Sequence, residues 1–518
     1  MVSSKTAVDE DTIDSLQNSS AQPVWKRVSL LTLASLTVAA AVLRFLFLAR
    51  KPFWFDECFS AEASRLSWGD FWRLMWWREA NMSLYYVLLR GWLHFGFSPF
   101  FIRSFSVAIS LLVLPAIYWL GCELFDQRVA LIAVALMTFN AYHIRYAQEA
   151  RSYSLLVLLT TLSSGFFVAM MRNPSRRNRW GYVLTSVFAV YAHLYALLLV
   201  AAQWTSVRGL QRTQQPRIWL RKTWAWIGIA VLPLLVFAAK TGAGPIRWII
   251  RPGLRDVVEF AEHLAGNAGL PLLLLYVATC IAAIVPQGKV PSLFRPGVAS
   301  DSWTRQFLLI WLLFPVVLTL LLSLARPIFL GRYFIFCLPP LIILAAAGLA
   351  RLRSTRLLAL SLAAMLLLSM QGTVRYYDHD FDLERDGSGV ATDYILAHTR
   401  PGDAILFYIP GARAPYEFFK SIRTAAGSQT GVLAGPEIIY PHHGDGLRYR
   451  DFTGKLGADF MRSVPGGYAR VWLVLMDNGI AGHPDATMLM INEILGEVFP
   501  RVEREQFPQV EVRLYSKP

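Results

Sequence analysis

The sequence predicts a polytopic α-helical membrane protein of about eleven spans, followed by an α/β domain outside the membrane. Of the 518 residues, 55% are hydrophobic and only 16% are charged, and the mean hydropathy is +0.41. A single soluble core would not use that many apolar residues. Apolar runs long enough to cross a bilayer recur as far as Gln371, and the composition shifts after that residue.

The formal net charge of +15 does not indicate nucleic-acid binding in this chain. Its Arg and Lys residues lie in short loops between apolar runs, where basic residues orient helices. The cysteines Cys58, Cys122, Cys280 and Cys337 are scattered and lack CxxC spacing, which excludes a disulfide framework and a zinc knuckle. Residues 1–27 form a polar, cytoplasmic tail, and the apolar run that follows is too long and too far along the chain for a cleaved signal peptide.

Nine apolar runs are predicted as single spans: 28–49, 103–122, 128–142, 153–171, 224–240, 268–286, 306–325, 331–350 and 356–371. The run 180–207 is too long for one crossing. Arg-rich stretches at 172–179 and 208–222 flank it, so both of its ends should face the cytoplasm. We therefore expect this run to cross twice and to turn near His193, which places the N-terminus inside and the C-terminus outside.

With this parity, the segments 50–102, 143–152 and 241–267, the turn 326–331 and everything after about residue 372 share the outer face. Within 50–102, Trp68, Phe71, Trp72, Met75 and Trp76 recur at helical spacing. They predict a helix in the membrane interface. The apolar piece 84–97 is also placed there, because counting it as a span would put the Arg-rich stretch 172–179 outside. The expected interfacial helices thus cover 59–97.

The segment 372–518 combines helical patterns with short β-type runs. Helices are predicted at 388–398 and 486–498, and strands at 404–409, 471–476 and 510–515. Alternation of this kind indicates a small α/β domain, here outside the membrane. It contains no Gly-rich nucleotide-binding loop.

Acidic residues stand at two positions on the predicted outer face. Asp56 and Glu57 are adjacent, directly after the first span, and Glu149 lies at the outer end of the third span. Carboxylates at the mouth of a membrane cavity are costly unless they are paired or used. The alternatives are an exposed loop acid for the first pair, and for Glu149 an ion pair with Arg145 or Arg151 that joins helix ends.

Four segments, in their order and spacing, resemble the GT-C superfamily of polyprenyl-phosphate-dependent glycosyltransferases. The resemblance is to the branch with protein O-mannosyltransferases and lipid A aminoarabinose transferases. The matching segments are Trp54–Glu57, Asn81–Tyr86, Tyr146–Tyr153, and Arg332–Tyr333 at the start of a span with Pro339 and Pro340. They extend over almost the whole membrane region. The resemblance implies a GT-C-like membrane domain at 28–371.

The resemblance also implies roles for individual residues. Asp56 would be the base that accepts the proton of the acceptor hydroxyl, and the expected catalytic residues are Asp56, Glu57 and Glu149. Expected substrate-binding residues are Arg332, whose guanidinium suits the lipid phosphate, and Tyr333, His193, Tyr146 and Arg151. Alternatively, Arg332 is an interfacial anchor and His193 a structural residue.

A divalent metal ion is a weaker expectation. Some relatives hold such an ion near Asn81 and His263, but Asn81 stands where a charged ligand can occur, which weakens the case.

The expected function is inverting transfer of a sugar from a polyprenyl-phosphate donor to a hydroxyl of a lipid, glycan or protein acceptor. The expected place is the outer face of a bacterial inner (plasma) membrane. One alternative is a flippase or transporter of lipid-linked sugars, although such proteins usually contain paired repeats and this chain has none. Another is an O-antigen polymerase or ligase.

Overall fold

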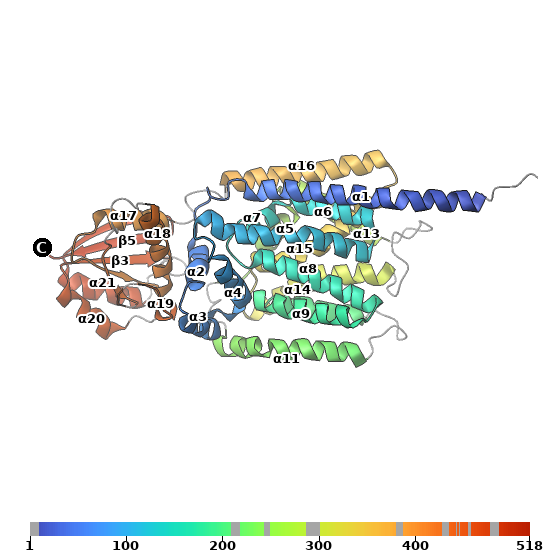
Figure 1. Cartoon of the computed structure of the whole chain (residues 1–518). Helices are drawn as coiled ribbons and strands as arrows, with labels where there is room; N and C mark the ends of the chain where they lie inside the picture. Colours follow the sequence, from blue (N-terminus) through green and yellow to red (C-terminus); the bar gives the residue numbers. More distant parts are fainter. Residues whose placement is uncertain are drawn as a thin grey trace, which may run out of the picture.

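A computed structural model shows a long helical bundle with a C-terminal α/β domain at one end (Figure 1). The structure describes residues 10–208, 218–242, 249–285, 301–379, 387–426, 435–441, 443–444, 446–453, 457–476 and 486–518. The basic residues at 209–217, which helped to orient the predicted spans, lie outside these ranges.

Seven helical segments in the described residues are long and apolar enough to cross a membrane. They belong to α1 (Glu10–Phe45), α5 (Pro99–Leu124), α8 (Tyr153–Arg172), α11 (Ile218–Thr241), α14 (Asp301–Ala325), η5 (Gly331–Cys337) with α15 (Leu338–Ala350), and α16 (Thr355–His379). The number is nine if two bent pairs each form one span. These are α6 (Gln127–Phe139) with α7 (Ala141–Ala147), bent by 61°, and α12 (Leu254–Ala265) with α13 (Leu270–Ile284), bent by 75°. The chain is a multi-pass membrane protein.

The predicted double run is two helices, α9 (Arg176–Ala192) and α10 (Ala196–Val207), which separate at the expected turn near His193. The two helices have 17 and 12 residues, so each is short for a complete crossing. The count of eleven spans therefore stays a prediction.

Two helices extend beyond the apolar runs that predicted them. Helix α1 begins at Glu10, inside the predicted tail. Helix α16 continues past Gln371 to His379. Its last turns are held by Tyr376, whose hydroxyl donates to Gln148 Oε1 at 3.0 Å, and by Tyr377, whose hydroxyl donates to the Leu43 carbonyl at 2.6 Å.

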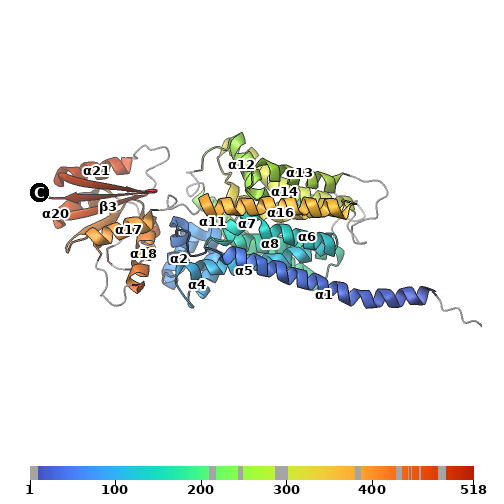
Figure 2. The ribbon, with the colours of Figure 1, turned by 90° about the horizontal axis from the view of Figure 1, so that it is seen from above.

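Short helices lie between the bundle and the C-terminal domain (Figures 1 and 2). The segment 59–97 is mainly helical, but the five residues at helical spacing do not share one buried face, because Trp76 is exposed along with Trp68 and Trp72. The placement of these helices in the membrane interface stays a prediction. Phe71, Leu74 and Met75 are buried, whereas Trp68 and Trp72 are exposed. The elements are α2 (Phe55–Ala63), α3 (Trp68–Leu74), η1 (Met75–Glu79), η2 (Ala80–Met82) and α4 (Ser83–Trp92).

The C-terminal domain contains a five-stranded sheet in the order β2-β1-β3-β5-β4. Strands β2, β1 and β3 are parallel, and β5 pairs antiparallel with β3 and β4. The strands are β1 (Ala404–Phe407), β2 (Glu437–Tyr440), β3 (Arg470–Met476), β4 (Arg501–Phe507) and β5 (Val510–Ser516). The three predicted strands are thus confirmed, and β2 and β4 are additional.

Helices cover both faces of this sheet. Apolar residues of α20 (Ala458–Gly467) and α21 (Ala486–Val498) pack on one face, and those of α17 (Ser388–His398) and α18 (Arg413–Ala426) pack on the other. The central strand β3 is accordingly buried on both sides. The predicted helices 388–398 and 486–498 are confirmed as α17 and α21. Helix α18, which the sequence analysis missed, faces α2, and the short helix α19 (Arg450–Thr453) lies in the same domain.

Candidate active site

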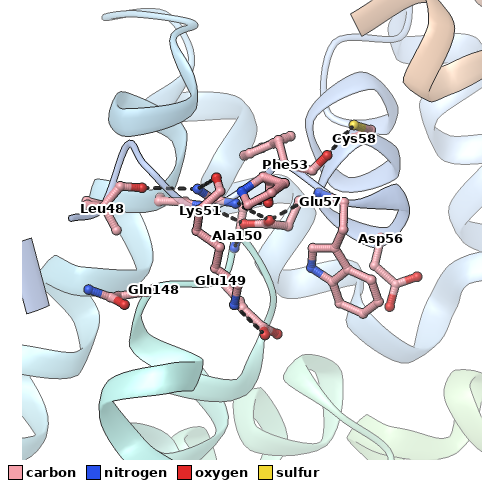
Figure 3. Close-up of polar contacts among 12 residues, drawn as sticks. Leu48, Lys51, Phe53, Asp56, Glu57, Cys58, Gln148, Glu149 and Ala150 are labelled. Atoms are coloured by element: carbon pink, nitrogen blue, oxygen red, sulfur yellow. Dashed lines mark hydrogen bonds and ion pairs between the residues drawn. The ribbon is translucent and has the colours of Figure 1, made fainter. Parts of the chain in front are cut away.

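The first turn of α2 carries Asp56 and Glu57. Consecutive residues of a helix are about 100° apart around its axis, so the two carboxylates leave α2 in different directions. Figure 3 shows Glu57 turned toward Ala150 and the Asp56 carboxylate turned away from it. The two neighbouring acids therefore have separate surroundings.

Glu57 is completely buried and fully bonded. Arg103 of α5 donates to both of its oxygens, through Nε at 2.8 Å and Nη2 at 2.6 Å. The Ala150 amide donates to Glu57 Oε1 at 2.8 Å. Arg103 in turn donates to the backbone carbonyls of Leu48, Lys51 and Pro52. Glu57 thus joins α2, α5 and the loop before Arg151, and its oxygens are occupied by protein donors.

Asp56 is partly exposed, and it lies between two arginines. Its Oδ2 is 3.5 Å from Nη2 of Arg151 and 4.0 Å from Nη2 of Arg332. These separations are within ion-pair range but longer than a charge-assisted hydrogen bond. The structure therefore brings together three predicted site residues from α2, the loop after α7 and η5, with space between their charged groups.

Arg151 is held by polar groups of the short helices. Its Nη1 is 3.3 Å from the Tyr86 hydroxyl of α4 and 3.5 Å from Ser60 Oγ of α2. The amide of the preceding residue, Ala150, is fixed by Glu57. Arg151 therefore has a defined position beside Asp56.

Glu149 is paired with a lysine that the sequence analysis did not consider. Lys51 Nζ donates to Glu149 Oε1 at 3.1 Å, and both side chains are buried (Figure 3). Burial lowers the pKa of Lys51 to about 8, although the negative charges of Glu149 and Glu57 oppose this shift. The geometry makes Glu149 part of a buried pair behind the loop that carries Arg151.

Tyr333 and His193 lie beside the arginine pair. Their ring centroids are 4.7 Å apart, and His193 Nδ1 accepts a hydrogen bond from the Tyr195 amide at 3.2 Å. Burial, together with the positive charges of Arg151 and Arg332, lowers the pKa of His193 to about 3. The neutral ring then carries its proton on Nε2, which has no hydrogen-bond partner in the described part of the chain.

A cavity of about 470 Å³ adjoins Arg332. Arginines and tyrosines line one part of it, and acidic and apolar residues of α12 line another. The lining includes Tyr142, Arg145, Tyr146, Asp256, Glu259, Phe260, His263 and Arg332. The predicted residue Tyr146 therefore borders the same cavity as Arg332, and its ring lies 4.7 Å from that of Tyr153.

The two residues expected near a metal ion have other contacts. Asn81 Oδ1 accepts a hydrogen bond from the Leu194 amide at 2.8 Å. His263 stacks on Tyr142 and lies 4.0 Å from Glu259. No cluster of three or more His, Cys, Asp or Glu side chains suited to a metal ion occurs in the described ranges. These residues do not fit a metal centre, and we derive no step that depends on one.

Glu79, at the end of η1, is a further acid near the site. Burial raises its pKa to about 7, while the positive charges of Arg151 and Arg78 oppose this shift and the negative charge of Asp56 adds to it. Glu79 is therefore within electrostatic reach of Asp56 and Arg151. The sequence analysis missed it because Glu79 and Arg78 resembled the ordinary polar face of an interfacial helix.

Solved structures of other proteins resemble the structure of this chain, although its sequence matches none of the families or curated proteins compared with it. No protein-family model and no curated protein matches the sequence. The crystal structure of ArnT from Cupriavidus metallidurans in the apo state matches with a TM-score of 0.59 at 12% identity, covering 95% of this chain and 98% of ArnT. The same protein bound to undecaprenyl phosphate matches with a TM-score of 0.60 at 12% identity, covering 93% and 97%.

This chain has the GT-C fold. The match extends over the membrane bundle and the C-terminal domain, since it covers nearly all of both chains. The expected GT-C-like helical membrane fold with a C-terminal α/β domain is therefore confirmed. At this identity the GT-C fold alone is shown, so the chemistry has to be argued from the residues of this site.

Proposed function

We propose that this protein is a glycosyltransferase that moves a sugar from a polyprenyl-phosphate donor to an acceptor hydroxyl, with Asp56 as the base. The observation that carries the proposal is the position of Asp56 between Arg151 and Arg332, beside a cavity at one end of a membrane bundle. The similar ArnT structure with undecaprenyl phosphate supports a lipid-phosphate donor.

Asp56 supplies the base that this reaction needs. A sugar or lipid hydroxyl is a poor nucleophile, and a carboxylate that accepts its proton during attack lowers the barrier. The hydroxyl oxygen forms a bond to the anomeric carbon while the bond from that carbon to the phosphate oxygen breaks. The proton goes to Asp56, and the electron pair leaves with the lipid phosphate. Attack opposite the leaving group inverts the anomeric configuration.

Arg332 is assigned to the departing phosphate. It lines the cavity and also lies 4.0 Å from Asp56, so a phosphate beside it would place the anomeric carbon near the base. A guanidinium can donate two parallel hydrogen bonds to phosphate oxygens. Positive charge placed where negative charge develops stabilises the transition state, and no general acid is then required.

The remaining predicted residues are assigned supporting roles. Arg151 holds the Asp56 carboxylate, and Glu57 and Glu149 are positioning residues because both are buried and paired with basic side chains. Neutral His193 offers its Nε2 proton to a substrate oxygen, next to Tyr333. Tyr146 provides an aromatic wall of the cavity on which a sugar ring can lie.

The proposed location is the outer face of a bacterial inner membrane, with the prenyl tail of the donor in the bilayer and its head group in the cavity. The acceptor is a hydroxyl of a lipid, a glycan or a protein. The apolar exterior of the bundle suits the lipid donor. Because the proposed donor is linked to a lipid phosphate and not to a nucleotide, the reaction needs no nucleotide-binding loop.

The test is turnover of radiolabelled polyprenyl-phosphate sugars by the purified protein with envelope lipid and glycan acceptors. Asp56→Asn should reduce turnover by roughly a hundredfold to ten-thousandfold while membrane insertion and donor binding persist. Asp70→Asn, at a carboxylate that accepts a hydrogen bond from the Ser67 hydroxyl at the start of α3, is the matched control and should retain activity. Movement of the lipid across vesicles without turnover would instead identify a flippase, and normal turnover in Asp56→Asn would remove Asp56 from the mechanism.

A further inference from the structure

Three phenylalanines around Asp56 contact the C-terminal domain. Phe53 stacks on Phe418 of α18, with ring centroids 4.6 Å apart and an interplanar angle of 12°. Phe59 of α2 meets the edge of Phe452, with centroids 4.9 Å apart and an angle of 83°. All four of these side chains are buried. The segment that carries Asp56 is therefore packed directly against the domain at the end of the bundle.

Phe55, the residue before Asp56, is the third contact. Its side chain packs on the apolar cluster of α17, α18 and the sheet face that they cover. Gly411 leaves room for it, because a Cβ at that position would lie only 3.3 Å from Phe55 Cζ. Gly411 has no left-handed backbone conformation, so its small size is what this contact requires.

The opposite side of α2 is held by the membrane bundle. Glu57 is fixed by Arg103 of α5, so α2 lies between the bundle and the C-terminal domain. A helix of nine residues is not stable by itself in water and depends on the elements packed against it. The direction of the Asp56 carboxylate is therefore determined jointly by Glu57 on one side and by the phenylalanine contacts on the other.

We propose that the C-terminal α/β domain positions Asp56 for catalysis, with Phe418 and Phe452 as positioning residues that act through α2. This inference rests on the proposed function of Asp56. According to this proposal, the C-terminal domain affects the catalytic rate. A domain that only bound the acceptor or covered the bundle would not affect that rate. Displacement of a reacting group by about 1 Å is enough to reduce a rate by roughly a hundredfold.

The test compares Phe418→Ala with Leu489→Ala in the full-length protein. Phe418 contacts Phe53 and Phe97, whereas Leu489 is an exposed apolar residue of α21 in the same domain. Phe418→Ala should lower kcat by about tenfold to a hundredfold with little change in donor KM, and Leu489→Ala should change neither. Hydrogen exchange in residues 53–63 should accelerate in Phe418→Ala only.

Two further variants distinguish the loss of this contact from a general folding defect. Phe418→Leu keeps an apolar side chain and should recover most of kcat. Gly411→Ala presses on Phe55 without deleting any contact, and it should lower kcat while the domain stays folded.

Unchanged kcat and unchanged exchange in Phe418→Ala would overturn the inference, as would a change confined to acceptor KM. If the wild-type protein turns over no polyprenyl-phosphate sugar, the proposed function fails. The exchange measurement then decides by itself whether this domain holds α2.

Discussion

Asp56 and Glu57 are consecutive in the sequence, yet the Asp56 carboxylate is partly exposed between Arg151 and the cavity-lining Arg332, whereas the Glu57 carboxylate is buried against Arg103. Asp56 Oδ2 lies 3.5 Å from Arg151 Nη2, whereas Glu57 accepts two hydrogen bonds from Arg103 and one from the Ala150 amide. A proton acceptor must be within reach of the substrate, and of these two carboxylates only that of Asp56 is partly exposed. The two acids should therefore respond differently to loss of charge.

Glu57→Gln should reduce the thermal stability of the protein more than it reduces the turnover per folded molecule. Removing one partner of a buried ion pair leaves the other charge uncompensated, which typically costs about 3–5 kcal/mol. We expect a lower thermal midpoint and a lower yield, with a smaller loss of turnover per folded molecule than in Asp56→Asn. Thermal unfolding and turnover normalised to folded protein measure the two effects. A stable Glu57→Gln protein that is as inactive as Asp56→Asn would contradict this division of roles and make Glu57 a candidate for the base.

Arg332→Lys should weaken donor use partly, and Arg332→Ala should weaken it severely. Lysine keeps the charge but loses the planar fork that binds two phosphate oxygens. Since negative charge builds on the departing phosphate, the deficit should appear in kcat as well as in donor KM. Exposed Arg326, in the nearby turn, provides the control through Arg326→Ala. If Arg332→Lys is as active as the wild type and Arg332→Ala has normal turnover, Arg332 is an interfacial anchor and does not bind the phosphate.

Glu79 should make donor affinity depend on pH near neutrality. Burial raises the pKa of Glu79 to about 7, so this residue becomes anionic as the pH rises from 6 to 8. An additional negative charge near Arg151 and Asp56 repels the lipid phosphate, and donor KM should increase over this range. Glu79→Gln should flatten the profile, whereas Glu497→Gln in the C-terminal domain should not. Wild-type and Glu79→Gln profiles of the same shape would contradict this prediction.

Glu62, at the end of α2, should make stability depend on pH. Burial raises its pKa to about 7, and the nearby charge of Glu417 contributes. Because this pKa is above its ordinary value, the associated stability is present below about pH 4.5 and is lost as the pH rises through about 7.

Glu62→Gln should therefore raise the thermal midpoint by roughly 1–3 °C at pH 8 and change it little at pH 5. Thermal unfolding at both pH values measures this difference. A midpoint below that of the wild type at pH 8 would show that the ion pair with Arg65 outweighs the burial penalty.

The orientation of the chain predicts the outcome of reporter fusions. A reporter after residue 178 should give a cytoplasmic signal, and reporters after 265 or 400 should give an outside signal. Pairs of reporters that are active on opposite sides of the membrane provide internal controls. An outside signal at 178 would mean that the segment 84–97 crosses the membrane and that Glu149 faces the cytoplasm.

Much of the fold could be predicted from the sequence, because long apolar runs and their flanking arginines are local signals. Apolar length and basic flanks predicted the membrane spans and the separation of α9 from α10, and alternation predicted β1, β3 and β5. Strand β4 was missed because its residues are polar and largely exposed at the edge of the sheet, where no hydrophobic pattern is needed.

The residue types of the candidate site were predicted from the sequence, and the tertiary structure decided the surroundings of each side chain. From the sequence alone, the charged residues Asp56, Glu57, Glu149, Arg151 and Arg332 were predicted to lie together on one face of the membrane. The sequence could not separate Asp56 from Glu57, or pair Glu149 with Lys51, because these environments depend on side chains nearly a hundred residues away, whose burial arises only when the helices pack. Packing also placed the C-terminal domain on α2 through Phe53 and Phe59, which no local pattern encodes.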